Sequence, residues 1–209
     1  MGSQLVNLIH TVAWSEYQRR HNAAPGAGVF AIGAQTGMGM TQNNIVTKVE
    51  QIPGSSPAAF RVQDDITITI TFDSNTSWVQ DWVMARSPQF QNDMLNHEQG
   101  HYNLVGLLAR DCFIELMQLK SQQFRTRHAA QAAIAAIWRR YTGKAQPVQD
   151  LYDDVQQTHH GANAASQRQW DGFIRTAFTQ ARASGETAPD GATYKVEILS
   201  VLTQAGLSV

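Results

Sequence analysis

The sequence predicts an α+β fold in which a small, mostly antiparallel N-terminal sheet packs on a long helix and on further C-terminal helices. Two observations predict this class. Segments with strand character are concentrated in residues 1–86, whereas residues 87–184 have mainly helical periodicity. Strands and helices that are segregated along the chain are typical of α+β domains. The 209 residues fit a single domain, in which residues 192–203 are expected to add a terminal strand.

The clearest strand lies at residues 66–72, where isoleucine and threonine alternate strictly. β-Branched side chains with one apolar and one polar face are typical of a strand that is buried on one side. Further strands are expected at residues 28–40, where Gly33 and Gly37 allow bends, and at residues 45–52. Together these segments account for the sheet of the expected fold.

The longest helix is expected at residues 88–121. Ser87 and Pro88 are a typical helix start, because a serine side chain caps free backbone N–H groups and proline fits the first helical position. The helices that follow are less sharply bounded. One is expected at residues 126–141, where an apolar stripe precedes Gly143, a residue type that often ends helices.

Pro147 is expected to begin the next helix, since proline is favoured at a helix start and disfavoured inside one. This helix is expected to run to the segment THHG at residues 158–161 and to restart near Trp170. The late apolar segment, which alternates in part, then gives the terminal strand. The helical half of the chain is therefore predicted to contain at least three helices.

The central feature of the long helix is the sequence HEQGH at residues 97–101. Positions i and i+4 of a helix share one face, so His97 and His101 can reach one metal ion, with Glu98 beside them. Two histidines that bind Zn²⁺ and a carboxylate that accepts a proton from water form the zinc-peptidase motif HExxH. We therefore predict one zinc ion on His97 and His101, with Glu98 as general base. A sheet packed on such a helix is zincin-like.

Apolar residues continue the face of the two histidines at helical spacing, namely Leu104, Val105, Leu108 and Cys112. The motif is therefore expected to face the protein core. Buried polar and charged groups need a partner, and a metal ion supplies one. Cys112 is the only cysteine, so an intrachain disulfide is excluded, and we expect it to be a small core residue.

A catalytic zinc site usually has a third protein ligand. Glu115 shares the face of His101 but lies fourteen residues further along, about 21 Å away on an unbroken helix, and is excluded. The adjacent pair His159 and His160 is the best source. The helical phase of the preceding residues favours His159, whereas the glycine after His160 lets the chain turn toward a metal. Spacing alone leaves both histidines open.

Over about residues 12–172 the chain resembles a bacterial family of predicted secreted zinc-dependent proteases. The blocks that carry the resemblance are VAWSEY at 12–17, GAQTG at 33–37, FD at 72–73 with SWV at 77–79, LNHEQGHY at 95–102, and Thr158, His160 and Gly161 with Gln167 and Trp170 behind them. The resemblance implies that His160 is the third ligand. It also implies a leader peptide and a secreted or periplasmic location, although the first residues of this chain show no signal-peptide pattern.

The function that these residues predict is zinc-dependent hydrolysis of peptide bonds, with a peptide or protein as substrate. Tyr152 and Tyr102 are candidates for stabilising the oxyanion. Residues 66–72 fit either an edge strand that binds an extended peptide or an ordinary sheet strand with one solvent face. Two alternatives remain: a zinc hydrolase of another amide or ester, and a non-catalytic binding module with a closed, structural metal site that also engages His159 or Asp153.

Composition excludes other classes of function. The net charge is −1 and there is no basic block, so no nucleic-acid partner is expected. The longest apolar runs are much too short to span a membrane. A hydrophobic content of 43% and a charged content of 16% are ordinary for a globular protein. Imidazole ligands suit zinc but also other first-row metals, so zinc is a preference.

Overall fold

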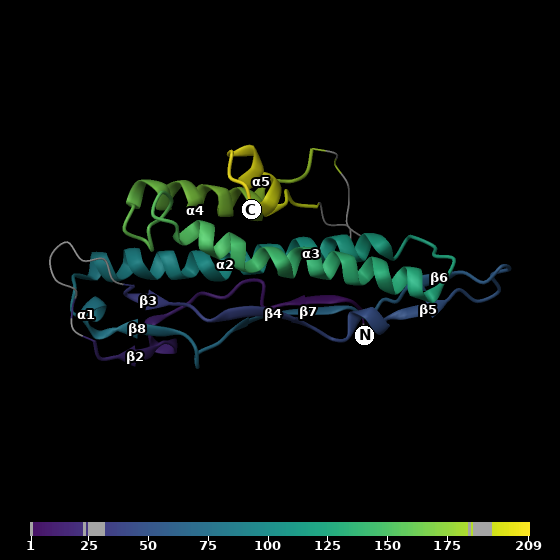
Figure 1. Ribbon diagram of the computed structural model, residues 1–209, viewed down its shortest axis with the longest axis horizontal. Helices are drawn as coiled ribbons and strands as arrows, with labels where there is room; N and C mark the ends of the chain where they lie inside the picture. Colours follow the sequence, from purple (N-terminus) through teal and green to yellow (C-terminus); the bar gives the residue numbers. More distant parts are fainter. Residues whose placement is uncertain (1, 23, 25–31, 184, 186–193) are drawn as a thin grey trace.

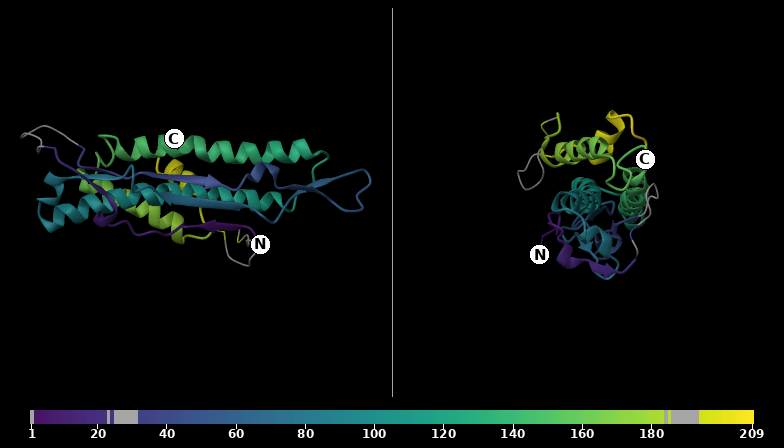
Figure 2. Two further views of the ribbon diagram at one scale, coloured as in Figure 1. Left: turned by 90° about the horizontal axis from the view of Figure 1, so that it is seen from below. Right: turned by 90° about the vertical axis from the view of Figure 1, so that its left-hand side faces the viewer.

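The computed structural model describes residues 2–22, 24, 32–183, 185 and 194–209. Two long helices, α2 (Pro88–Leu119) and α3 (Arg127–Asp153), lie side by side along the longest axis of the molecule (Figure 1). Small sheets cover one side of this pair, and α4 (Ala164–Thr179) and α5 (Ile198–Gln204) cover the other (Figures 1 and 2). The predicted α+β class, with N-terminal strands and later helices, is confirmed.

The strands of the described residues form three small sheets rather than one. Their order is β1-β7-β4, β2-β8-β3 and β5-β6. The strands are β1 (Gln4–Val6), β2 (Gln18–Arg20), β3 (Ala34–Gln35), β4 (Met38–Gln42), β5 (Val49–Gln51), β6 (Phe60–Val62), β7 (Thr67–Phe72) and β8 (Trp78–Gln80). The pairs β1-β7 and β2-β8 are parallel, and the other three are antiparallel. The expectation of a mostly antiparallel sheet therefore holds only narrowly.

Strand β7 confirms the strand that the alternating pattern predicts at residues 66–72. Ile66, Ile68 and Ile70 are fully buried, and the strand contacts α2. However, β7 is the middle strand of its sheet, between β1 and β4, so it has no free edge for a peptide. Of the two interpretations of residues 66–72, the ordinary sheet strand is correct and the edge strand is wrong.

The other predicted strands are shorter than expected. Within residues 28–40, positions 28–31 lie outside the described residues, and the rest is divided between β3 and the start of β4. Within residues 45–52, a 3₁₀ turn, η2 (Ile45–Thr47), precedes β5. Asn44 before this turn has a positive φ of 57°, a conformation that asparagine tolerates better than most residues and that interrupts a strand.

Helix α2 forms as the sequence predicts. The hydroxyl of Ser87 accepts a hydrogen bond from the Phe90 N–H at 3.3 Å, and Pro88 occupies the first turn. Cys112 is fully buried on the inner face, as expected, and burial raises the pKa of its thiol to about 12. None of the helices in the described ranges is both long and apolar enough to cross a lipid bilayer.

Helix α3 corrects the sequence analysis, because it continues through both Gly143 and Pro147. A proline inside a helix costs about 3 kcal/mol, since it lacks an N–H and its ring crowds the carbonyl four residues earlier, here that of Gly143. Residues on both sides of this point, Tyr141 and Val148, are buried. Burial of one such side chain contributes roughly 1.5–3 kcal/mol, so packing outweighs the cost of the proline.

Positions 192 and 193 of the predicted terminal strand lie outside the described residues, and the rest of this prediction is wrong, because residues 198–204 form helix α5. Ile198, Val201 and Leu202 are buried at helical spacing. The first N–H of this helix, from Ile198, donates to the Asp111 carboxylate of α2 at 2.9 Å. A side chain from a distant part of the chain therefore caps the helix, which no local pattern indicates.

Candidate metal centre

The N-terminal half of α2 presents the motif histidines toward the interior. His97 and His101 are 1% and 7% exposed, and their Nε2 atoms lie 3.1 Å apart. Glu98, on the same turn, is 2% exposed. The helix therefore places all three side chains as the motif predicts, one turn apart and largely out of solvent.

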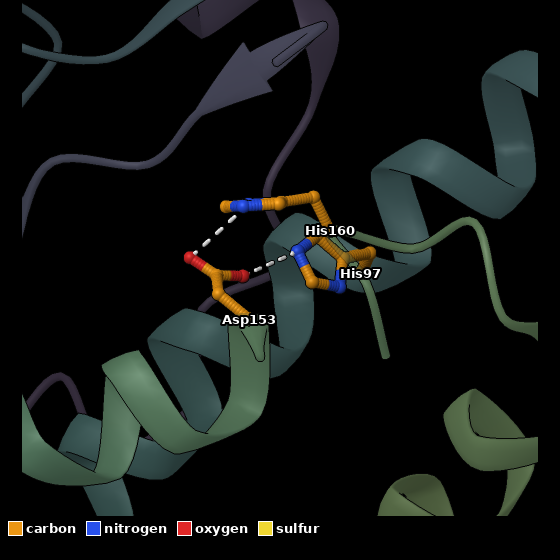
Figure 3. A group of neighbouring side chains, drawn as sticks. All are labelled: His97, Asp153 and His160. Atoms are coloured by element: carbon orange, nitrogen blue, oxygen red, sulfur yellow. Dashed lines mark hydrogen bonds and ion pairs between the residues drawn. The ribbon is translucent and has the colours of Figure 1, made fainter. Parts of the chain in front are cut away.

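Two more side chains complete a cluster around this pair. Asp153, the last residue of α3, has its Oδ1 atom 3.0 Å from Nε2 of His97 and 3.1 Å from Nε2 of His101. His160, in the loop after α3, has Nδ1 3.4 Å from the other oxygen of Asp153 (Figure 3). The ligand atoms of His97, Asp153 and His160 all lie within 4.8 Å of one another.

These spacings fit a metal site. Donor atoms about 2 Å from a tetrahedral zinc ion lie about 3.3 Å from each other. Four contacts within the cluster, His97–His101 and those of Asp153 with His97, His101 and His160, measure 3.0 to 3.4 Å. The group whose ligand atoms all lie within 4.8 Å of one another contains His97, Asp153 and His160, and does not include His101. Neutral imidazole and carboxylate groups are the donors that zinc accepts. The cluster is thus suited to one metal ion, with Asp153 as a donor that the sequence analysis had placed only in the closed-site alternative.

His160, rather than His159, belongs to this cluster. His159, His160 and Gly161 have positive φ angles of 49°, 48° and 81°, so the chain forms a left-handed turn after α3. A Cβ atom at Gly161 would lie 3.0 Å from the Cβ of His97, so this glycine also allows the turn to approach α2. The glycine after the histidine therefore has the role that the sequence analysis gave it.

Amide side chains orient the two motif histidines. Gln167 Oε1 lies 3.1 Å from Nδ1 of His97, and Gln149 Oε1 is hydrogen-bonded to Nδ1 of His101. An amide oxygen accepts from an N–H, so each Nδ1 carries its proton and each Nε2 faces the cluster. Tyr152 stacks on the ring of His97, with centroids 4.7 Å apart and planes at 11°. Such partners fix the ring orientation that metal binding needs.

Burial and mutual interactions shift the pKa values of the cluster residues. Burial by itself lowers the pKa of His101, but the hydrogen bond and negative charge of Asp153 outweigh it and raise this pKa to about 9. Burial raises the pKa of Asp153, but hydrogen bonds from His101 and His97 hold it well below its usual range. Burial lowers the pKa of His160. A metal ion bound through His101 near neutral pH would therefore have to displace a proton from this imidazole.

Glu98 lies beside the cluster and accepts a hydrogen bond from another part of the chain. Its Oε2 atom is 2.6 Å from the hydroxyl of Thr36, in the segment between β3 and β4. The Thr36 hydroxyl is in turn 2.6 Å from the hydroxyl of Tyr17. Glu98 is thus a buried carboxylate beside the cluster, with one oxygen hydrogen-bonded to the Thr36 hydroxyl rather than to a cluster side chain.

A cavity of about 350 Å³ opens onto these groups. Its lining includes the histidines of the cluster, Glu98, Gln146 of α3 and residues 34–38 of β3 and the start of β4. Strand β3 pairs only with β8, so its other edge is unpaired in the described sheet. An edge strand therefore does border the cavity, but it is β3 rather than residues 66–72.

Neither predicted oxyanion tyrosine lines this cavity. The Tyr152 hydroxyl donates to the His97 carbonyl at 3.2 Å and accepts from Gln167 Nε2 at 2.7 Å. The Tyr102 hydroxyl donates to the Asn7 carbonyl at 2.6 Å. Both hydroxyls are used in packing the fold, so the two assignments are replaced by structural roles. Glu115, excluded as a ligand, forms an ion pair with Arg140.

Gln99 and Gly100, the two variable positions of the HExxH motif, have structural roles that the motif does not specify. The Gln99 side chain donates to the His10 carbonyl at 2.9 Å and accepts from the Val12 N–H at 2.9 Å, which anchors the N-terminal segment on α2. At Gly100, an added Cβ would lie 2.1 Å from the Tyr152 hydroxyl. A glycine is therefore required for Tyr152 to stack on His97.

We expect Gly100→Ala to destabilise the protein by about 1–3 kcal/mol, the usual range for overpacking a core. It should also weaken metal binding, because the displaced Tyr152 no longer orients His97. Urea denaturation and zinc titration measure both effects. Gly172→Ala is the matched control, because a Cβ there meets nothing within 4 Å. A Gly100→Ala variant with wild-type stability and zinc affinity would show that this packing is not needed.

Comparisons with known proteins add no further assignment. Searches against protein-family models, curated proteins and solved structures each find no match to this chain.

Proposed function

We propose that the protein is a zinc-dependent peptidase whose metal is held by His97, His101 and His160, with Glu98 as general base. The observation that carries the proposal is the position of Glu98. It is buried beside the cluster, and its Oε2 atom is hydrogen-bonded to the Thr36 hydroxyl rather than to a cluster side chain. A site that only stores a structural metal has no use for such a buried, uncoordinated carboxylate.

The chemistry follows from these positions. A zinc ion in the cluster would activate a water molecule for attack and polarise the scissile carbonyl. Glu98 would accept the proton of the attacking water and return it to the leaving amine. Gln149 and Gln167 would keep the two motif imidazoles oriented throughout. This division of roles, with histidines that bind and a glutamate that transfers protons, is the one that the HExxH motif predicts.

The surroundings of the cavity support a peptide as substrate. The unpaired edge of β3 offers backbone N–H and C=O groups to an extended chain, as in strand addition. His160 also borders a second cavity of about 570 Å³, lined in part by Trp82, Phe90 and Met94. An apolar side chain of a substrate that crosses the metal would fit there.

The metal content of the purified protein tests the proposal. We expect elemental mass spectrometry to give one zinc per chain after reconstitution, and none in His97→Ala. Digestion of a peptide library, with ester and non-peptide amide substrates in parallel, then separates a peptidase from another zinc hydrolase. If the wild-type protein binds no metal even with excess zinc, the proposed site is wrong.

A structural metal site is the second candidate, and the position of Asp153 favours it. A carboxylate oxygen within 3.1 Å of both motif Nε2 atoms can serve as a fourth protein donor beside His160. Four protein donors close a tetrahedral site and leave no position for water. Cobalt substitution distinguishes the candidates, because a hydroxamate changes the visible spectrum of the cobalt protein only if one coordination position is open. An unchanged spectrum, together with no hydrolysis, would establish the structural site.

A further inference from the structure

We propose that Thr36 and Tyr17 are positioning residues for Glu98, which they hold in place through a chain of two buried hydroxyl groups. This inference rests on the proposed function, because it concerns the general base of that reaction. It gives a role to the two segments VAWSEY and GAQTG, which the zinc site itself leaves unexplained. Tyr17 is the last residue of the first segment, and Thr36 is the fourth residue of the second.

The hydrogen bonds that link Tyr17, Thr36 and Glu98 are short, and all three side chains are buried. Tyr17, Thr36 and Glu98 are 5%, 4% and 2% exposed. Both links, from Tyr17 to Thr36 and from Thr36 to Glu98, measure 2.6 Å between oxygen atoms. Hydrogen bonds of this length to a carboxylate are at the strong end of the range in proteins. The three side chains come from segments separated by 19 and 62 residues, so the tertiary fold assembles them.

The direction of the hydrogen bonds follows from the number of protons. An ionised Glu98 carboxylate can only accept, so Thr36 donates its single hydroxyl proton to it. Thr36 must then accept from Tyr17. Burial, and next the negative charge of Glu98, raise the pKa of the Tyr17 hydroxyl, so Tyr17 keeps its proton and remains a donor. Tyr17 therefore donates to Thr36, and Thr36 donates to Glu98.

Hydroxyl groups suit this task better than a cation. A buried carboxylate without a donor is costly, and a lysine or arginine partner would supply a donor at the expense of basicity. Thr36 satisfies Oε2 of Glu98 and adds no net charge. The second oxygen, Oε1, then remains for a water molecule in the cavity. A carboxylate fixed through one oxygen is oriented for proton transfer through the other.

Neighbouring groups hold both members of the chain. The Tyr17 ring packs on Trp14 and Phe72, with centroids 5.1 and 5.5 Å away. Next to Thr36, the Gly37 N–H donates to the Ser77 hydroxyl at 2.9 Å. A Cβ at Gly37 would lie 1.9 Å from the Thr76 hydroxyl, so the backbone beside Thr36 is tightly packed against residue 76. The chain is therefore rigid enough to position a side chain.

The test compares Thr36→Val, Thr36→Ser and Tyr17→Phe in zinc-loaded protein. We expect Thr36→Val to lower kcat roughly 10- to 100-fold, the effect of misplacing a catalytic group by about 1 Å, with KM and zinc content unchanged. Thr36→Ser should restore kcat, because it keeps the hydroxyl. Tyr17→Phe should have a smaller effect, and the double variant Tyr17→Phe/Thr36→Val should be no slower than Thr36→Val alone, because the two act as one unit.

Thr69→Val is the control for loss of a threonine hydroxyl. Thr69 lies on β7 beside the buried Ile68 and Ile70, so it faces away from α2, and we expect no change in kcat. Crystal structures of zinc-loaded wild type and Thr36→Val supply a readout that does not depend on activity. We expect the Glu98 carboxylate to turn away from its wild-type position in the variant.

Three results would overturn the inference: a Glu98 side chain that keeps its position in Thr36→Val, a Thr36→Ser variant as impaired as Thr36→Val, or an unchanged kcat in Thr36→Val. These outcomes are distinct from failure of the proposed function. If Glu98→Gln stops hydrolysis but Thr36→Val does not slow it, the peptidase stands and the positioning role is wrong. If the wild-type protein hydrolyses nothing, the position of Glu98 in the two crystal structures still decides the inference.

Discussion

Glu98→Gln is expected to abolish hydrolysis while the zinc ion stays in place. Glutamine has the shape of glutamate and its side-chain oxygen can still accept from Thr36, so the surroundings of residue 98 are preserved. It cannot take a proton from water at neutral pH. General acid–base catalysis contributes typically about 10²- to 10⁴-fold, so kcat should fall by about that factor. Because Glu98 is not a donor to the metal in the proposal, one zinc per chain should remain.

Turnover of a peptide found in the library digestion, together with elemental analysis, measures both parts of this result. Glu115→Gln is the matched control on the same helix, because Glu115 pairs with Arg140 and lies about 21 Å from the motif along α2. We expect full activity and full zinc content in that variant. A Glu98→Gln protein that cleaves the peptide as fast as wild type would refute the proposed mechanism, whatever its zinc content.

His160→Ala is expected to weaken zinc binding far more than His159→Ala. Only His160 belongs to the donor cluster with His97 and Asp153. Loss of a partner that merely orients a ligand costs about 10- to 100-fold in metal affinity, so loss of a donor should exceed that range. Replacement of His159 removes an imidazole from the same left-handed turn but leaves the donors intact.

Competition with a chromophoric chelator at constant pH gives both zinc affinities. His159→Ala is the control for any loosening of the turn. The ratio of the zinc affinities of the two variants therefore gives the contribution of the His160 imidazole as a metal ligand. Equal losses in the two variants would mean that the turn as a whole, rather than one imidazole, supports the metal. Wild-type affinity in His160→Ala would reduce the donor set to His97, His101 and Asp153.

The part of the site that lies within one helix could be predicted from the sequence. A spacing of four residues puts His97 and His101 on one face whatever the rest of the fold does. The choice of His160 over His159 depended on the resemblance, and in the structure His160 lies in one group with His97 and Asp153. Asp153 itself had no local signal, because its role depends on where α3 ends.

The end of α3 illustrates why such signals fail. Gly143 and Pro147 have the local properties of a helix end and a helix start, and so predict two separate helices. Contacts with α2 extend the helix through both positions, and this extension places Asp153 opposite His97. Tertiary packing thus sets the end of this helix twelve residues later than the local sequence predicts.

The strands show the complementary case. The alternation at residues 66–72 predicted β7 correctly, because its pattern reports which face is buried. Alternation contains no information about neighbours along the hydrogen-bonding direction, so it could not distinguish a middle strand from an edge strand. The contacts of Thr36 and Tyr17 with Glu98 could not be predicted for a similar reason, since neither Thr36 nor Tyr17 is distinctive within its own segment.

The candidate metal ligands differ in backbone strain, because His160 lies in the left-handed turn at residues 159–161. Two histidines in this conformation each carry roughly 1–2 kcal/mol of backbone energy, whereas His97 and His101 lie on an unstrained helix. A bond between His160 and a metal ion would offset this conformational cost, and loss of the ion would remove that compensation. If His160 binds the proposed metal ion, exchange of that ion should therefore begin at this turn, because strain in its backbone favours release of His160 while α2 keeps His97 and His101 in place.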